Sequence, residues 1–248
     1  MTRANIRIIK DAVESFCPGF LLRPILTLRA AHKYRAYAGR SAEDVFTDIH
    51  DHNRWGGRQS VSGQGSDLAQ TATIRAALPQ ILRELQIRSI LDAPCGDFHW
   101  MRHVDLGDCD YVGGDIVATL AANCQAQFGG PHRRFMHLDI TKDDLPPVDM
   151  IFCRDCFIHL PLALVEAALR NFKRSGAKYL FTTTIPNKKV NSDVVAGGYR
   201  PINLRLPPFH FPPPLRMIPD DPPSTHLANN PDFQRHMALW EIKQLSAV

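Results

Sequence analysis

Residues 89–100 read SILDAPCGDFHW, an apolar run that ends at Asp92 and passes into a turn containing Gly96. A short apolar run bounded by turn residues is typical of a buried strand. Four more runs of this kind follow, at 111–115, 135–139, 149–153 and 178–184. The stretches before three of them have the length of a βα unit and are compatible with helices, most clearly at 120–128 and 162–172, whereas only nine residues separate the run at 149–153 from the one before it. This alternation predicts a doubly wound α/β fold with a mainly parallel sheet.

The flanks of this region complete the predicted sheet. Before the first strand, a stripe of apolar residues from Ile74 to Leu85 follows helical spacing. After residue 184, closely spaced prolines exclude regular helices. The segment 238–243 then alternates as a strand does, and 215–218 is the candidate partner for it. We therefore expect a seven-stranded sheet whose C-terminal strand pair is antiparallel.

The composition is that of a folded protein with nearly balanced charge. The 248 residues are 44% hydrophobic and 22% charged, and 29 basic against 25 acidic side chains leave a formal charge of +4. These values argue against global disorder and against a dedicated nucleic-acid binder. No apolar run reaches the roughly 18 residues of a membrane span, and no secretory signal is recognised. We expect a soluble, cytoplasmic protein.

The six cysteines are expected to be free thiols in that reducing compartment. Cys153 and Cys156 alone have the spacing of a metal or redox motif, and one such pair supplies at most half of a zinc site. Cys153 also falls within an apolar run. The cysteines therefore predict buried thiols and no metal site.

Three of the predicted strands end in an aspartate, at Asp92, Asp115 and Asp139. In an open parallel sheet, ligands bind beyond the carboxyl ends of the strands, so these side chains are expected to converge on one crevice. Carboxylates placed there can accept hydrogen bonds from hydroxyl or amino groups. The alternative is that each aspartate caps the helix that follows it.

At the turn after the first strand, the sequence resembles the class I S-adenosylmethionine-dependent methyltransferases, over about residues 85–185. That family often has three glycines in this turn, whereas this chain keeps Gly96 and has Pro94 and Phe98 at the other two positions. Pro94 lacks a backbone N–H, so another group must replace that donor. The loop at 62–66 is the candidate.

Short signatures narrow the resemblance to a small group of bacterial stand-alone methyltransferases whose acceptor is undefined. They are Trp-Gly at 55–56, Ser-Gly-Gln-Gly-Ser at 62–66, Pro-Cys-Gly-Asp-Phe at 94–98 and Arg-Asp-Cys at 154–156. The resemblance implies a helical N-terminal extension over residues 1–50 and a methyltransferase domain over 51–248. Within that domain we expect a Ser/Gly lid loop at 53–66 and a proline-rich, substrate-side insertion at 186–214.

The N-terminal extension is strongly basic. Residues 1–40 carry eight Lys and Arg against two acidic residues, and Ile6, Ile9, Val13 and Phe16 follow helical spacing. A basic amphipathic helix can lie on a membrane surface or bind an acidic partner. The alternative is an extension with a solvated basic face.

The resemblance also implies S-adenosyl-L-methionine as the cofactor and assigns residues to it. The turn at 92–97 would line the methionyl end, Asp115 would hold the ribose hydroxyls, Ile116 would pack on the adenine, and Asp139 would accept from the adenine amino group. The complete predicted cofactor set is Trp55, Ser62, Gly63, Asp92, Ala93, Gly96, Asp97, Asp115, Ile116, Asp139, Ile140 and Arg154.

The fourth strand leads into the predicted catalytic residues, Asp155 and His159. If a helical turn begins after Cys153, these two residues lie four apart on one face and can share a proton. His159 is then the predicted base, and Asp155 is its orienting partner or the base itself. A histidine bonded to a backbone carbonyl is the alternative for His159. Arg154 is expected either to bind an acidic acceptor or to pair with a nearby carboxylate.

The predicted reaction is methyl transfer, to a hydroxyl of a small polar molecule or of a sugar or glycan. The first alternative is a chain that binds the cofactor without turnover or serves as a partner subunit. The second is a nucleotide-dependent oxidoreductase, although only Gly96 of the G-x-G-x-x-G pattern is present. No nucleic-acid partner is expected.

Overall fold

The computed structural model describes residues 34, 36–220 and 234–245, so the predicted basic helix near the N-terminus lies outside the described residues. The chain divides into two compact units, 1–39 and 40–248. Helix α3 (Ala42–Asp51) belongs to the second unit, with Val45 and Ile49 buried. The predicted extension over residues 1–50 thus includes a helix, α3, that is grouped with the larger unit.

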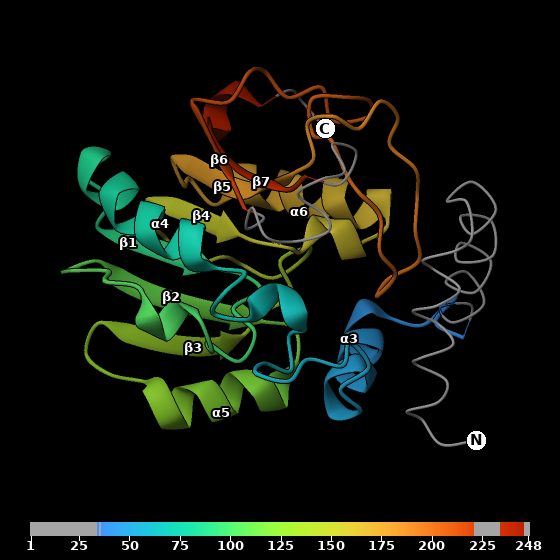
Figure 1. The fold of residues 1–248 in the computed structure, drawn as a ribbon, viewed down its shortest axis with the longest axis horizontal. Coiled ribbons are helices and arrows are strands. Elements are labelled where there is room, and N and C mark those ends of the chain that lie inside the picture. Colours follow the sequence, from blue (N-terminus) through green and yellow to red (C-terminus); the bar gives the residue numbers. More distant parts are fainter. Residues whose placement is uncertain (1–33, 35, 221–233, 246–248) are drawn as a thin grey trace. The chain divides into compact units, whose positions relative to one another are not determined.

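The larger unit contains a seven-stranded sheet in the order β3-β2-β1-β4-β5-β7-β6 (Figure 1). The strands β1 to β5 are parallel to one another. The strand β7 lies between β5 and β6 and is antiparallel to both. This confirms the predicted fold class and the antiparallel C-terminal pair. The strand bounds are Ser89–Asp92 (β1), Asp110–Asp115 (β2), Arg133–His137 (β3), Met150–Cys153 (β4), Tyr179–Thr184 (β5), Arg216–Pro219 (β6) and His236–Glu241 (β7).

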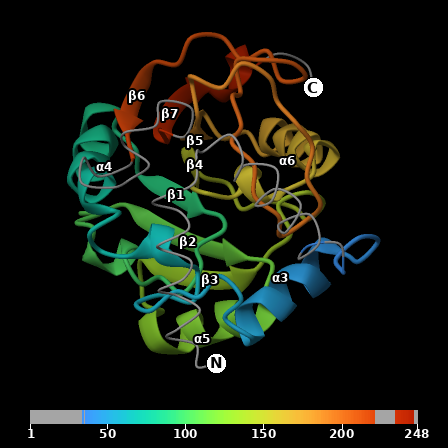
Figure 2. The same cartoon turned by 45° about the vertical axis from the view of Figure 1, so that its right-hand side comes forward.

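Helices cover both faces of the sheet, which is why its strands are apolar on both sides. The helices α4 (Ala72–Glu84) and α5 (Ala118–Phe128) pack with Ile90 and Phe152 in one core cluster. The helix α6 (Leu162–Arg174) packs with Leu91 and Ile151 in the other. Figure 2 shows α4 and α6 on opposite sides of the sheet. Successive strand residues thus point to different cores, as the two-residue period of a strand requires.

The strand β3 ends two residues before the predicted end, at His137 rather than Asp139. The chain turns there because Oδ1 of Asp139 accepts hydrogen bonds from the backbone N–H of Thr141 (2.9 Å) and from its hydroxyl (2.6 Å). An aspartate that binds the backbone two residues ahead favours a turn over an extended strand. Asp139 therefore follows the strand instead of ending it.

The proline-rich segment 186–214 contains neither helix nor strand, as the prolines predict. It is held to the core by buried apolar side chains at Ile202, Leu204 and Phe209. Asn203 fixes it further, since its side-chain amide donates to the carbonyls of Pro186 (2.9 Å) and Lys188 (3.0 Å). This segment is thus an ordered loop that lies next to the region after β4, where the backbone N–H of Arg200 donates to the carbonyl of Ile158.

Candidate functional site

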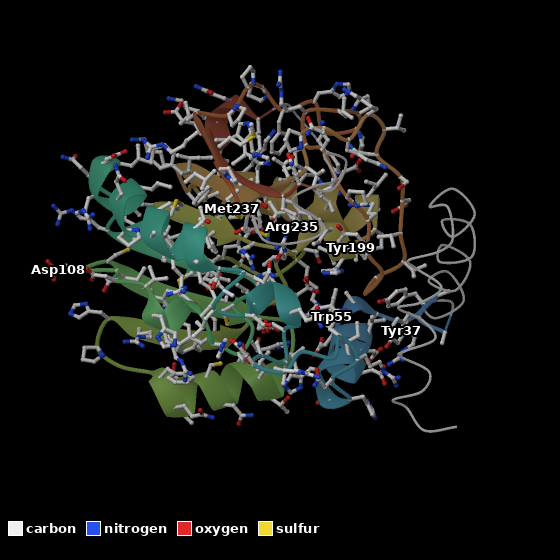
Figure 3. The ribbon with its side chains drawn as sticks, in the orientation of Figure 1. Tyr37, Trp55, Asp108, Tyr199, Arg235 and Met237 are labelled. Atoms are coloured by element: carbon white, nitrogen blue, oxygen red, sulfur yellow. The ribbon has the colours of Figure 1, made fainter. Side chains whose placement is uncertain are left out.

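A cavity of about 410 Å³ opens beyond the carboxyl ends of the parallel strands. This volume lies within the range of small-molecule sites. Figure 3 shows Trp55, Tyr199 and Arg235 at this edge of the sheet, and Asp108, which precedes β2, at the opposite edge. The predicted site residues in the wall are Trp55, Ser62, Gly63, Asp92, Gly96, Asp115, Ile116, Asp139, Ile140, Arg154, Asp155 and His159.

The turn after β1 requires glycine at position 96 for two reasons. Gly96 has a φ of +56°, a conformation that side-chain-bearing residues rarely adopt. A Cβ at this position would also lie 2.3 Å from Oγ of Ser62. The Ser/Gly loop therefore packs directly on the turn, and any side chain at position 96 would push the two segments apart.

Asp115, at the end of β2, fixes the same turn from the other side. Its two carboxylate oxygens accept hydrogen bonds from the backbone N–H groups of Gly96 (3.0 Å) and Val117 (3.0 Å). Burial raises the pKa of Asp115, and these two donors act in the opposite direction. The carboxylate is thus held in one orientation in the cavity wall.

Asp92 is buried at the end of β1 and accepts a 2.7 Å hydrogen bond from the hydroxyl of Tyr111. Burial raises the pKa of Asp92 to about 7, although the Tyr111 hydrogen bond acts to lower it. Near neutral pH the Asp92 carboxyl therefore exists in both protonation states. Whether it carries a proton depends on which groups bind next to it in the cavity.

Two predicted cofactor residues do not belong to the wall. Ala93 is fully buried, and its N–H donates to the carbonyl of Phe152. Asp97 holds the Ser/Gly loop, because its carboxylate accepts from the hydroxyl of Ser60 (2.8 Å) and from the N–H of Val61 (3.1 Å). The prediction that Asp97 lines the methionyl end is therefore corrected: this side chain faces the loop.

Asp139 lies in the wall but also has local partners in a turn, and the described stretch from it to β4 contains no helix that it could cap. Lys142 adds an ion pair at 3.2 Å to the two contacts with Thr141. Burial acts to raise the pKa of Asp139, but the hydrogen bonds from Thr141 and Lys142 outweigh it and leave the pKa below its usual range. Asp139 is thus a fixed anion at this end of the cavity.

A cluster of four charged side chains forms another part of the site. Nε of Arg154 donates to Asp220 (2.9 Å), Nη1 of Arg154 pairs with Asp155 (3.2 Å), and Arg235 donates to the same oxygen of Asp155 (2.5 Å). The guanidinium of Arg154 also lies over the ring of Trp100 at 5.5 Å. This arrangement agrees with the expected pairing of Arg154 with nearby carboxylates.

Asp155 is an ion-pair partner in this cluster. Burial acts to raise the pKa of its carboxyl, but Arg154 and Arg235 outweigh burial and lower it. The predicted helical pairing of Asp155 with His159 is wrong, because Asp155 has a φ of +53° and precedes the single turn η3 (Phe157–His159). Its N–H donates instead to the hydroxyl of Thr183 at 2.8 Å.

His159 is held by a backbone carbonyl, as the alternative interpretation anticipated. Its Nδ1 lies 2.6 Å from the carbonyl oxygen of Gly198, so Nδ1 carries the proton and Nε2 has a lone pair. The ring of Trp55 stacks on the imidazole with centroids 4.9 Å apart, and the Tyr199 ring lies at 5.9 Å. Burial lowers the pKa of His159, although the Gly198 carbonyl and Asp155 act to raise it. The imidazole is thus neutral at pH 7.

The sequence did not reveal several residues of the wall. Arg235 has no motif around it, and contact with Asp155 brings it to the site. Phe46 and His50 come from α3, whose amphipathic pattern could have identified that helix as part of the site.

The described residues form neither a metal centre nor a membrane-spanning helix. No group of three or more His, Cys, Asp or Glu side chains is placed to hold a metal ion. No helix in the described part of the chain combines the length and apolar character that a bilayer span requires.

Comparison with known proteins identifies the fold. No protein-family model matches the chain, and no curated protein matches its sequence. Solved structures do match. The magnesium protoporphyrin IX methyltransferase of Synechocystis PCC 6803, with bound SAH, is 12% identical over 80% of this chain and 98% of its own, with a TM-score of 0.55.

Two other matches give the same result. The 1,6-didemethyltoxoflavin-N1-methyltransferase of Burkholderia thailandensis is 15% identical over 84% of this chain and 88% of its own, with a TM-score of 0.52. The mitomycin 7-O-methyltransferase is 13% identical over 86% of this chain and 66% of its own, with a TM-score of 0.56. The chain therefore has the Rossmann-like fold of class I methyltransferases.

Proposed function

We propose that this chain is an S-adenosyl-L-methionine-dependent methyltransferase that acts on a hydroxyl group of a small polar molecule or sugar. The observation that carries this proposal is the cavity wall, which combines the segments after β1, β2, β3 and β4 with the Ser/Gly loop. Open α/β sheets bind their ligands at this edge. The S-adenosylhomocysteine bound in two structures with this fold supports the choice of cofactor.

The residues in the wall fit the chemical groups of this cofactor. Nη2 of Arg154 is buried and has no hydrogen-bond partner among the described residues, so it can donate to a carboxylate. Asp115 would accept from the ribose hydroxyls, and Asp139 from the adenine amino group, with Ile116 and Ile140 packing on the adenine. Asp92, Ser62 and Gly63 would line the methionyl end.

When bound, the cofactor supplies a methyl group on a sulfonium, and the acceptor oxygen bonds to that carbon as the carbon–sulfur bond breaks and its electron pair stays on sulfur. His159 can take the hydroxyl proton at Nε2, because Nδ1 is committed to Gly198 and the imidazole is neutral. Asp155 is a weak base here, because two arginines stabilise its charged form. We therefore propose His159 as the base and Asp155 as the ion-pair partner that holds Arg154 and Arg235 in the wall.

Titration calorimetry tests the cofactor assignment. Purified protein is titrated with S-adenosylhomocysteine and, separately, with NADH. We expect saturable, one-site binding of S-adenosylhomocysteine and none of NADH. Binding of NADH alone would overturn the proposal in favour of an oxidoreductase. A mass-shift assay on extracts separated into glycans, lipids, proteins and small metabolites then identifies the acceptor class, and we expect the added methyl group in the glycan or small-metabolite fraction.

A further inference from the structure

We propose that the acceptor is a flat aromatic compound whose ring packs against Trp55 and Tyr199 and whose hydroxyl hydrogen-bonds to Nε2 of His159. This inference rests on the proposed function and narrows its acceptor. The first observation is that all three side chains line the same cavity, although they come from three distant segments of the chain. Among the described residues Nε2 has no hydrogen-bond partner, so it can accept from a hydroxyl.

The two aromatic rings border the imidazole from different directions. Trp55 lies nearly parallel to it, at an interplanar angle of 30°, whereas Tyr199 is tilted by 55°. Tyr199 is also one of the few large apolar side chains that stay exposed among the described residues, at 44%. Aromatic rings attract other rings in offset or edge-on contact, so this border suits a planar ligand.

Trp55 is fixed before any acceptor binds. The ring of Phe46 packs against it edge-on, with centroids 6.2 Å apart. On the loop side, a Cβ at Gly63 would lie 3.3 Å from Cβ of Trp55, so the glycine lets the loop pass close to it. A ring held on two sides loses little freedom when a ligand packs on it, which favours binding.

Apolar side chains form part of the wall beside His159. Ile158 and Leu160 flank the histidine in the chain, and both belong to the cavity wall together with Phe46. The nearby carboxylate of Asp155 already has partners, since it is paired with Arg154 and Arg235. A sugar ring carries many hydroxyls that need partners when buried, so this wall favours an aromatic ring over a sugar.

The chemistry of the base points the same way. The partner of Nδ1 is a neutral carbonyl, so among the described residues no carboxylate is hydrogen-bonded to the imidazole, and Asp155 favours the imidazolium only through its charge. Imidazole has an ordinary pKa of about 6.5 and a phenolic hydroxyl one of about 10, a gap of roughly 3.5 units. For a hydroxyl as weakly acidic as water, the pKa gap to imidazole is several units wider still. A phenol-type hydroxyl therefore suits His159 better than an alkyl one.

Ligand binding to the S-adenosylhomocysteine-loaded protein tests this inference. The probes are 2-naphthol, its saturated analogue decahydro-2-naphthol, and methyl glucoside, each titrated by NMR. We expect 2-naphthol to bind about tenfold tighter than the saturated analogue, the size of one aromatic contact. Methyl glucoside is expected to bind more weakly than both. Equal binding of the two naphthols, or tighter binding of the glucoside, would overturn the aromatic acceptor.

Single-residue variants distinguish the loss of the aromatic contacts at Trp55 and Tyr199 from general damage to the fold. Trp55→Leu and Tyr199→Leu should each weaken 2-naphthol binding by about fivefold or more, and Tyr199→Leu should leave S-adenosylhomocysteine binding unchanged, because Tyr199 lies outside the predicted cofactor set. The exposed Leu215, outside the cavity wall, provides the control Leu215→Ala, which should change neither. Unchanged naphthol binding in both leucine variants would contradict the subsite. Failure of the wild-type protein to bind S-adenosylhomocysteine would instead contradict the proposed function.

Discussion

The two halves of the cavity are assembled in different ways. The half formed by the ends of β1 and β2 uses residues that lie close in sequence to their strands, and Asp115 binds its backbone neighbours directly. The half around His159 brings together Trp55, Tyr199 and Arg235, which come from loops far apart in the chain. The first half is therefore set by strand topology, whereas the second depends on side-chain contacts between loops.

This difference separates two functions that one cavity must serve. A site built on strand ends is rigid and can keep one geometry for a constant ligand. A site built from loops can change by substitution without disturbing the sheet. We infer that the strand-end half recognises the cofactor and that the loop half determines the acceptor, and the following predictions test this division.

The largest expected effect is that of His159→Ala. Removing the proposed base should lower kcat by about 10²- to 10⁴-fold and leave S-adenosylhomocysteine binding unchanged. In the wild type, kcat/KM should fall as pH drops below the pKa of His159, which burial places under the ordinary 6.5. The exposed His103, outside the cavity wall, provides the control His103→Ala. Full turnover by the His159 variant would show that the loop half lacks the base.

Next is Asp155→Ala, which should act mainly on stability. It leaves the buried Arg154 and the nearly buried Arg235 without a shared anion, and loss of one partner from a buried ion pair costs about 3 kcal/mol or more. Glu166→Ala breaks the more exposed pair with Arg170 and should cost under about 1 kcal/mol. Urea unfolding measures both. A large loss of turnover with unchanged stability would instead assign Asp155 to the chemistry.

Asp92→Asn should change how stability depends on pH. The folded-state pKa of about 7 exceeds the ordinary 3.8, so the folded protein binds more protons between these values and loses stability as pH rises through that window. The loss amounts to about 1.4 kcal/mol per pH unit, and asparagine removes it. Unfolding curves from pH 4 to 8 should therefore show a shallower decline in the variant. Parallel curves would mean that Asp92 is ionised throughout.

The smallest effect we predict is that of Gly96→Ala, with Gly107→Ala as a matched control. Both glycines have similar positive φ values, +56° and +55°, but only the Cβ at position 96 meets another atom, Oγ of Ser62. The strain common to both should cost about 1 kcal/mol of stability. Only the variant at position 96 should also lose S-adenosylhomocysteine affinity, by roughly tenfold, in calorimetry. Equal S-adenosylhomocysteine affinities of the two variants would show that the turn at Gly96 does not contribute to the cofactor site.

The same division explains how much of the molecule the sequence could predict. The strands from β1 to β5 were predictable because their apolar runs and spacing are local properties. The positions of Asp92 and Asp115 were predictable in turn, because each residue ends one of these strands. Arg235 and the true surroundings of His159 did not follow, because contacts between distant loops leave no periodic signal. Asp97 was misassigned, since its position in the turn does not reveal that the side chain binds Ser60 and Val61.

The charged cluster has a consequence for how the sequence can vary. Asp220 and Arg235 are joined by a backbone hydrogen bond of 2.9 Å, and both are tied to the region after β4, Asp220 through Arg154 and Arg235 through Asp155. Because the two arginines share the carboxylate of Asp155, a substitution at one of these four positions leaves a buried charge without its partner at another. The four residues are therefore expected to change together rather than one at a time.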